Sequence, residues 1–436
     1  MNPLAKELND SIASTNPHVL QMLSDAGREL FFPKGILSQG AEAKEKAHYI
    51  NATIGIAKEK GHTMAFDSVM ASICHLSASQ ALTYAPSFGI PELRQLWKAA
   101  LAEKNPSLAH KQFSLPVVTS GITHAVSLFA TLWVSPGETV LLPDMMWGNY
   151  NLILNVSRGI AVRHYPLFFE NRRLDLKGLA RSLAEAAADS RKVNLILNFP
   201  NNPSGYAPTR EEAEGICRIL LDAAEGGTRI VVAMDDSYFG LFYEPETMKE
   251  SLFGLLCGLH PRILAVKLDG ATKENFVWGL RVGFITYGTG LDSGSEAFYE
   301  ALEKKTAGAV RGSISNASHL SQSIVFKSMQ SGAYAAEKKE KFHILAARAR
   351  RVKEVLTDAK YATAWDVYPF NSGYFMCIRL KRVDAEKLRI HLLEKYGIGL
   401  ISIGRHNLRI AFSCVEQDHI QPLFDSILKG ARELDI

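Results

Sequence analysis

Reactive side chains follow several short apolar runs of this chain, at the points where the runs end. Asn202 follows residues 193–197, Asp235 and Tyr238 follow residues 230–234, and Lys273 follows residues 262–269. A lysine amine has an ordinary pKa of about 10.4, and desolvation beside other cations lowers that pKa and makes the amine a better nucleophile. A carboxylate stabilises a cation by about 4 kcal/mol at ~4 Å and an effective dielectric constant near 20. A site where an amine acts as nucleophile and base near a carboxylate is one interpretation of these residue types, and a solvated lysine with carboxylates that cap a turn is the other.

The apolar runs alternate with helical stretches along the middle of the chain. Helical patterns precede each of the apolar runs at 139–143, 193–198 and 229–235, and a further apolar run follows at 262–269. Such alternation predicts crossover units and a mostly parallel sheet covered by helices on both faces, which is an α/β fold. Ligands of such sheets bind beyond the carboxyl ends of the strands, where the reactive side chains stand.

The chain is long enough for more than one unit, because domains contain roughly 150 residues each. A long charged helical stretch at 333–359 is followed by shorter strand-like runs and a terminal helical stretch, which is typical of a smaller α+β unit. We therefore expect an N-terminal arm and part of the small domain in residues 1–60, a large domain in 61–320 and a small C-terminal domain in 321–436.

Composition excludes several classes of protein. The 436 residues are 47% hydrophobic and 22% charged, which is ordinary for a globular chain, and the net charge of +4 is spread without basic tracts that would bind nucleic acid or a membrane. The five cysteines contain no C-x-x-C pair, and the histidines have no metal-binding spacing, so we predict no metal. Without a signal pattern or an apolar run long enough to span a membrane, we expect a cytoplasmic protein.

Together the motifs resemble those of the class I/II aminotransferases that depend on pyridoxal phosphate, in the family's order across about residues 50–415. The resemblance implies fold type I, with a large domain built on a mostly parallel seven-stranded sheet and a smaller α+β domain. It implies that Lys273 forms the Schiff base and shuttles the substrate proton. Asp235 would pair with the protonated pyridine nitrogen, and Tyr238 and Asn202 would reach the phenolic oxygen.

The same resemblance suggests a phosphate cradle. Gly121, Ile122 and Thr123 match a turn at the start of a helix, where free N–H groups bind anions. Arg281 would bind the phosphate, and Trp147 would stack on the cofactor ring. The family's usual serine is replaced by Gly270, which leaves Thr272 as the nearest hydroxyl of that loop.

Substrate contacts are implied as well. Arg409 and the backbone at Gly55 would bind the α-carboxylate, close to Trp147 and Asn202, and arginine suits this task because its fork binds carboxylates in a bidentate manner. Tyr84 resembles the residue that reaches the phosphate of a neighbouring subunit, which implies a homodimer with shared active sites. Arg311 resembles the residue with which relatives acting on aspartate bind the side-chain carboxylate from the partner subunit, although relatives with other substrates also carry it.

The resemblance implies an aminotransferase that moves an amino group between an amino acid, with aspartate or glutamate the leading candidates, and a 2-oxo acid through a pyridoxal 5'-phosphate aldimine. Two alternatives stay open at this point. A lyase or decarboxylase could use the same cofactor, and a non-catalytic regulator could use the same fold.

Overall fold

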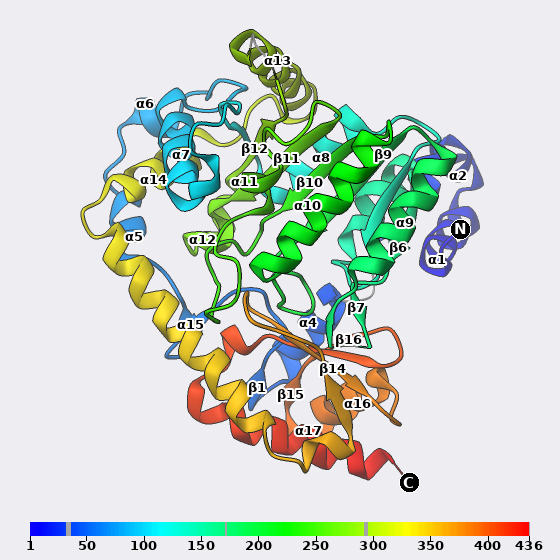
Figure 1. The fold of residues 1–436 in the computed structure, drawn as a ribbon. Coiled ribbons are helices and arrows are strands. Elements are labelled where there is room, and N and C mark those ends of the chain that lie inside the picture. Colours follow the sequence, from blue (N-terminus) through cyan, green and yellow to red (C-terminus); the bar gives the residue numbers. More distant parts are fainter. Residues whose placement is uncertain (32–35, 171, 292–294, 436) are drawn as a thin grey trace.

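A seven-stranded sheet forms the centre of the computed structural model, which describes residues 1–31, 36–170, 172–291 and 295–435 (Figure 1). Its strand order is β4-β12-β11-β10-β9-β5-β6. Every neighbouring pair is parallel except the two that involve β12, which runs antiparallel to β11 and to β4. The strands are β4 (Val117–Thr119), β5 (Thr139–Pro143), β6 (Ala161–Tyr165), β9 (Lys192–Asn198), β10 (Arg229–Asp235), β11 (Ile263–Gly270) and β12 (Gly283–Gly288).

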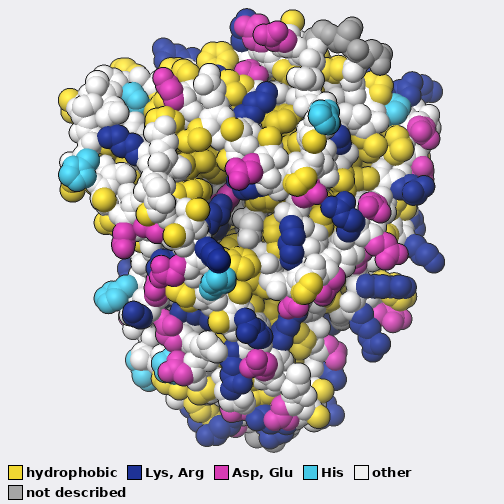
Figure 2. Space-filling view, turned by 60° about the vertical axis from the view of Figure 1, so that its left-hand side comes forward, with side chains coloured by type: hydrophobic (Ala, Val, Ile, Leu, Met, Phe, Trp, Pro, Cys, Tyr) yellow, Lys and Arg dark blue, Asp and Glu magenta, His cyan; other side chains and the backbone are white. Residues whose placement is uncertain are grey.

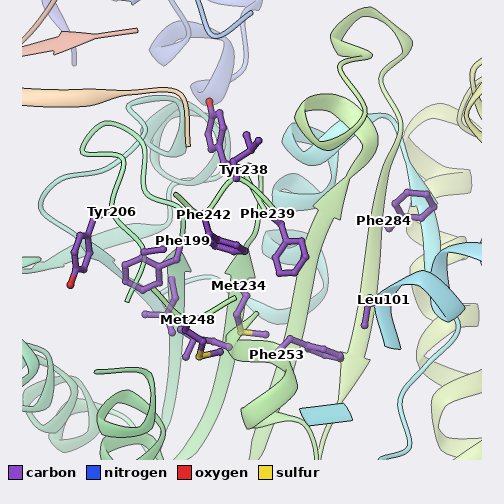
Figure 3. Packing of buried hydrophobic residues seen from close by; sticks show 14 of the residues in the cluster. Leu101, Phe199, Tyr206, Met234, Tyr238, Phe239, Phe242, Met248, Phe253 and Phe284 are labelled. Atoms are coloured by element: carbon purple, nitrogen blue, oxygen red, sulfur yellow. The ribbon is translucent and has the colours of Figure 1, made fainter. Parts of the chain in front are cut away.

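Helices cover both faces of this sheet because the strands are apolar on both faces. Along β10, Val232 and Met234 belong to one core cluster, whereas Val231 and Ala233 belong to another that includes residues of α8. Figure 3 shows the first of these clusters, in which Tyr238 lies at one end beside Phe239 and Phe242. The helices around the sheet are α7 (Pro91–Lys104), α8 (Gly121–Trp133), α9 (Leu176–Asp189), α10 (Arg210–Glu225), α11 (Leu252–Leu256), α12 (Ala271–Glu274), α13 (Ser295–Ile314) and α14 (His319–Gln330). The predicted α/β fold class is confirmed.

A second sheet lies in the C-terminal part and has the antiparallel order β13-β14-β17-β16. The N-terminal strand β1 (Ile50–Asn51) joins this part of the molecule by pairing with β15 (Ile398–Gly399). The long helix α15 (Tyr334–Leu356) connects the region of the large sheet to that of the small one (Figure 1). The other elements here are α4 (Ile36–Lys46), β13 (Trp365–Val367), β14 (Met376–Leu380), α16 (Ala385–Tyr396), β16 (Ile401–Ile403), β17 (Asn407–Ile410) and α17 (Ile420–Leu434). The domain limits given above stay a prediction.

The remaining elements are short or peripheral. They include the helices α1 (Pro3–Thr15), α2 (Pro17–Met22), α3 (Asp25–Glu29), α5 (Asp67–Ile73) and α6 (Ala78–Ala81) and the hairpins β2 (Lys58–Glu59) with β3 (His62–Thr63) and β7 (Phe168–Phe169) with β8 (Arg173–Leu174). None of the described helices is both long and apolar enough to cross a bilayer. On the face drawn in Figure 2, basic and acidic side chains are interspersed, in agreement with the absence of charge tracts from the sequence.

Candidate active site

The carboxyl ends of β9 and β10 meet at the site because the two strands are parallel and Asp235 pairs in register with Asn198. The Asn198 side chain joins the two strand ends, since its Nδ2 donates to the Asp235 carbonyl at 3.0 Å and its Oδ1 accepts from the backbone N–H of Asn202 at 2.9 Å. The predicted residues Asn202 and Asp235 are thereby brought together. Asn198 was not predicted from the sequence, although it is the last residue of its strand.

Asp235 is buried, and both of its carboxylate oxygens accept hydrogen bonds. Oδ2 accepts from the Tyr150 hydroxyl at 2.5 Å, and Oδ1 accepts from the backbone N–H of Ser237 at 3.1 Å and from its hydroxyl at 2.5 Å. Burial, followed by the charge of Asp235, raises the pKa of Tyr150 well above its ordinary value, so this phenol keeps its proton and remains a donor. The adjacent Asp236 has a different environment, in which it pairs with Lys267 and accepts from the Ser251 hydroxyl.

Lys273 lies in the short helix α12, and its Nζ is 4.8 Å from the centroid of the Tyr238 ring. Burial lowers the pKa of Lys273 to about 8, Asp235 opposes this shift, and the positive charge of Arg281 adds to it. An amine with such a pKa is partly unprotonated near neutral pH and is a better nucleophile than an exposed lysine. The structure therefore brings Lys273, Asp235 and Tyr238 together with the electrostatics that the sequence argument required.

An anion cradle lies at the start of α8. Gly121 has a φ of +76°, and a Cβ atom there would lie 2.4 Å from Nη2 of Arg281, so only glycine lets the guanidinium pass this close. The Ser120 side chain does not cap α8 within the described structure, which leaves the N–H groups of the first turn, including those of Ile122 and Thr123, available to a ligand.

Two residues that precede Lys273 decide which hydroxyl this loop can offer to an anion. The Thr272 hydroxyl is buried and has no hydrogen-bond partner among the described residues, so an anion's oxygen would fit it. A Cβ at Gly270 would lie 2.6 Å from the carbonyl oxygen of Val282 and 2.9 Å from Cα of Gly283, because β11 and β12 pair at this point. The backbone packing thus explains why this chain carries glycine where a serine was expected from the resemblance.

A second anion position surrounds the buried Arg409 on β17. Its Nη1 donates to Oδ1 of Asn202 at 3.1 Å, its Nη2 donates to the Thr53 carbonyl at 2.8 Å, and its Nε has no partner in the described structure. A Cβ at Gly55 would lie 3.7 Å from the Tyr238 hydroxyl, which places this glycine beside the same site. Arg409 can therefore present a fixed positive charge to a carboxylate between Gly55, Asn202 and Tyr238.

The remaining predicted residues differ in their surroundings. Trp147 is half-buried after β5, and its ring packs edge-on against Tyr150 with centroids 5.5 Å apart. Tyr84 is 91% exposed, and Arg311 lies exposed on α13. Neither Tyr84 nor Arg311 has a hydrogen bond or ion pair with the described site residues, so one chain does not bring these two into the cluster.

Sequence reasoning missed several neighbours of the site. Tyr374 donates from its hydroxyl to the Lys273 carbonyl at 3.3 Å, and the centroid of the Phe375 ring lies 4.2 Å from the Arg409 guanidinium carbon. Tyr150 was also missed, although it closely follows Trp147, a residue that the sequence already placed at the site. Among the described residues, no group of three or more His, Cys, Asp and Glu side chains could hold a metal ion.

Comparison with known proteins gives a family for this arrangement. Residues 47–427 match the family described as aminotransferase class I and II. An aspartate aminotransferase of Bacillus sp. (strain YM-2) is 26% identical over 58% of this chain and 60% of its own length. A tyrosine aminotransferase of Bos taurus is 30% identical over 39% of this chain and 34% of its own. Three other curated relatives match over 39% to 47% of their own length.

Solved structures share the fold over nearly the whole chain. An aminotransferase from Anaerococcus prevotii has a TM-score of 0.83 and 21% sequence identity, covering 95% of this chain and 100% of its own. A mutant aspartate aminotransferase of Thermus thermophilus has a TM-score of 0.73 and 18% identity, covering 94% and 99%. The family match extends over most of the chain and includes each segment that forms the site, so this chain belongs to the class I and II aminotransferases.

Proposed function

We propose that this chain is an aminotransferase that binds pyridoxal 5'-phosphate covalently through Lys273. The observation that carries the proposal is the half-buried Lys273, whose Nζ lies 4.8 Å from the Tyr238 ring centroid and whose pKa is lowered to about 8 near Asp235 and Arg281. The buried Thr272 hydroxyl, which has no hydrogen-bond partner within the described part of the chain, and the glycine cradle at Gly121 support a phosphate site close to this amine. Family membership supports the same reaction class.

Pyridoxal phosphate supplies an aldehyde that condenses with an amine and a ring that accepts the electron pair released at the substrate Cα. Asp235 would hold the proton on the ring nitrogen, and Tyr150 would orient Asp235 by donating to its Oδ2. Tyr238 and Asn202 would donate to the phenolic oxygen. Lys273 Nζ would take the proton from the substrate Cα, because the amine is free to act as a base once the substrate amine has replaced it.

Other side chains would bind the phosphate and the ring. Arg281 and the N–H groups of Gly121, Ile122 and Thr123 would surround the phosphate, with Thr272 completing the set. Trp147 would cover one face of the ring. Thr272 would supply the hydroxyl of this loop, since the backbone around Gly270 leaves no space for a side chain there.

The α-carboxylate of an amino acid would bind at Arg409, beside the backbone of Gly55. Arg409 already donates to Asn202 and to the Thr53 carbonyl, so its guanidinium is held in place before a substrate arrives. A fixed donor loses little side-chain entropy on binding, which favours affinity. The Arg409 Nε, for which the described residues offer no partner, provides one more donor.

We also propose a homodimer in which each chain completes the site of the other with Tyr84 and Arg311. The apolar side chains around Tyr84 in the sequence support a covered surface, since Leu82 is 82% exposed and Tyr84 itself is 91% exposed. Contiguous exposed apolar area is typical of protein interfaces. Arg311 from the partner would then select a substrate with a second carboxylate, which makes aspartate and glutamate the preferred amino donors.

The test is a screen of amino acids with 2-oxoglutarate, in which the absorbance of the bound cofactor and the oxo-acid products are followed. We expect turnover with aspartate or glutamate and no turnover in Lys273→Ala, together with loss of the cofactor adduct that borohydride fixes on the wild-type chain. Oxo acid released without turnover of the amino acceptor would indicate a lyase instead. A full rate in Lys273→Ala would refute the proposal.

A further inference from the structure

The turn that carries Lys273 is anchored by a buried carboxylate on the next residue. Glu274 is 4% exposed, and its Oε1 accepts from Lys104 Nζ at 2.5 Å and from Lys338 Nζ at 2.6 Å. The two lysines come from separate helices, α7 and α15. Burial alone would raise the pKa of Glu274, but the two lysines lower it to about 2, so the carboxylate stays ionised at all ordinary pH values.

The neighbouring residues of this turn are held in the same way. The Tyr374 hydroxyl donates to the Lys273 carbonyl at 3.3 Å, and the Tyr334 hydroxyl donates to Oδ1 of Asn275 at 2.8 Å. Tyr334 and Lys338 both belong to α15, and Tyr374 stands just before β14. Side chains that follow the large sheet in the sequence therefore hold each residue from Lys273 to Asn275.

Anchoring Glu274 fixes the direction of the Lys273 side chain. In a helical turn, consecutive side chains point about 100° apart around the axis, because there are 3.6 residues per turn. With Glu274 tied to α7 and α15, Lys273 is turned toward Tyr238, where its Nζ lies 4.8 Å from the ring centroid. The helix α12 spans only Ala271–Glu274, so its own backbone hydrogen bonds do little to resist rotation.

We propose that Glu274, held between Lys104 and Lys338, is a positioning residue that aims the Lys273 amine into the active site. This inference rests on the function proposed above. Glu274 acts through the turn and not through its charge, because the groups that shift the pKa of Lys273 are Asp235 and Arg281. Because Lys338 lies on α15 and pairs with Glu274, the direction of the Lys273 side chain depends on the position of α15, the helix that links the two sheets.

Two substitutions with opposite changes of charge distinguish an effect on the position of the Lys273 side chain from a direct effect of charge on its pKa. Glu274→Gln makes the surroundings more positive, and Lys338→Met makes them more negative. A direct charge effect would lower the pKa of Lys273 in the first variant and raise it in the second. If the Lys273 side chain is no longer held in place, its amine becomes exposed to water in both variants. The positioning role therefore predicts that the pKa of Lys273 rises in both, from about 8 toward the ordinary value of 10.5.

The pKa of Lys273 is measured in the full chain without cofactor, from the pH dependence of its acylation by a small reagent followed by peptide mass spectrometry. Activity of the loaded enzyme is measured separately. We expect kcat to fall about tenfold to hundredfold in both variants, as for a misplaced catalytic group, while KM for the amino acid changes little because Arg409 is untouched. Lys353→Met is the matched control for Lys338→Met, since it removes a 2.5 Å ion pair with Glu244 at the other end of α15, against 2.6 Å for the pair of Lys338 with Glu274.

An unchanged or lowered pKa of Lys273 in Glu274→Gln, or an undiminished kcat, overturns the proposal. If Glu274→Gln does not fold, the salt dependence of Lys338→Met decides. Lys338 is 29% exposed, so a charge effect on Lys273 would fade between low and high salt, whereas a loss of aim would persist. If the wild-type chain turns over no amino acid, the proposed function fails, and the acylation data still decide whether Glu274 positions Lys273.

Discussion

Gly270→Ser tests most directly why the loop before Lys273 carries glycine at this position. A serine here would supply the hydroxyl that the family resemblance leads one to expect, and by that reasoning Gly270→Ser would bind the cofactor more tightly. The structure leads to the opposite expectation. A Cβ at this position would meet the Val282 carbonyl oxygen at 2.6 Å and Cα of Gly283 at 2.9 Å, and both are backbone atoms that cannot rotate away.

The cost follows from what must move. Gly270 pairs with Gly283 in the antiparallel ladder of β11 and β12, so relief of the contact separates the two strands or shifts the turn that carries Lys273. Overpacking of a well-filled interior costs about 1–3 kcal/mol. We therefore expect Gly270→Ser to lower the free energy of unfolding by that amount and to weaken cofactor binding, because the amine and the Thr272 hydroxyl are displaced together.

The assay pairs denaturant unfolding of the chain without cofactor with a titration of pyridoxal phosphate followed by absorbance. Gly279→Ala is the matched control in the same loop, since no described atom lies within 4 Å of a Cβ at that position. We expect this control to change stability by less than about 0.5 kcal/mol. A Gly270→Ser chain that is as stable as the wild type and binds the cofactor more tightly would refute the reasoning.

Three further predictions concern single side chains of the site. Tyr150→Phe removes the 2.5 Å hydrogen bond to Asp235, and we expect a loss of about 1.5–3 kcal/mol, seen as weaker cofactor binding; unchanged affinity would contradict this role. Arg409→Lys keeps the charge but cannot reach both Asn202 and the Thr53 carbonyl, so we expect KM for the amino acid to rise about tenfold or more with a smaller change in kcat, and an unaltered KM would contradict the assignment. In the chain without cofactor, Lys273 loses its proton above a pKa of about 8, so its acylation should increase with pH around a midpoint near 8, and a midpoint near 10.5 would show that the amine is not buried.

Much of the candidate site could be predicted from the sequence because strand ends are local features. The alternation of apolar runs and helical stretches placed Asn202, Asp235 and Lys273 at neighbouring strand ends, and parallel pairing then brings those ends to one edge of the sheet. The contacts separate Asp235 from the adjacent Asp236, since Asp236 is engaged by Lys267.

Other parts could not be predicted because they depend on contacts between distant segments. Asn202 meets Arg409 only after the small sheet has folded against the large one, and Tyr150 reaches Asp235 from the loop after β5. The crowding around Gly270 is a property of one backbone register that no composition or spacing reveals. Nothing in the sequence distinguishes Glu274 from an exposed charged residue, and only the packing of α7 and α15 shows it to be buried.

The helix α15 has a thermodynamic consequence for the whole chain. Its Leu345 is part of the core beneath the large sheet, whereas Ala349 and Val352, a turn or two further along, are part of the core beneath the small one. If one half of the molecule unfolded and α15 unfolded with it, the core of the other half would lose the apolar residues that α15 contributes to it. We therefore expect the two halves to melt cooperatively, as a single calorimetric peak, even though each possesses a sheet and an interior of its own.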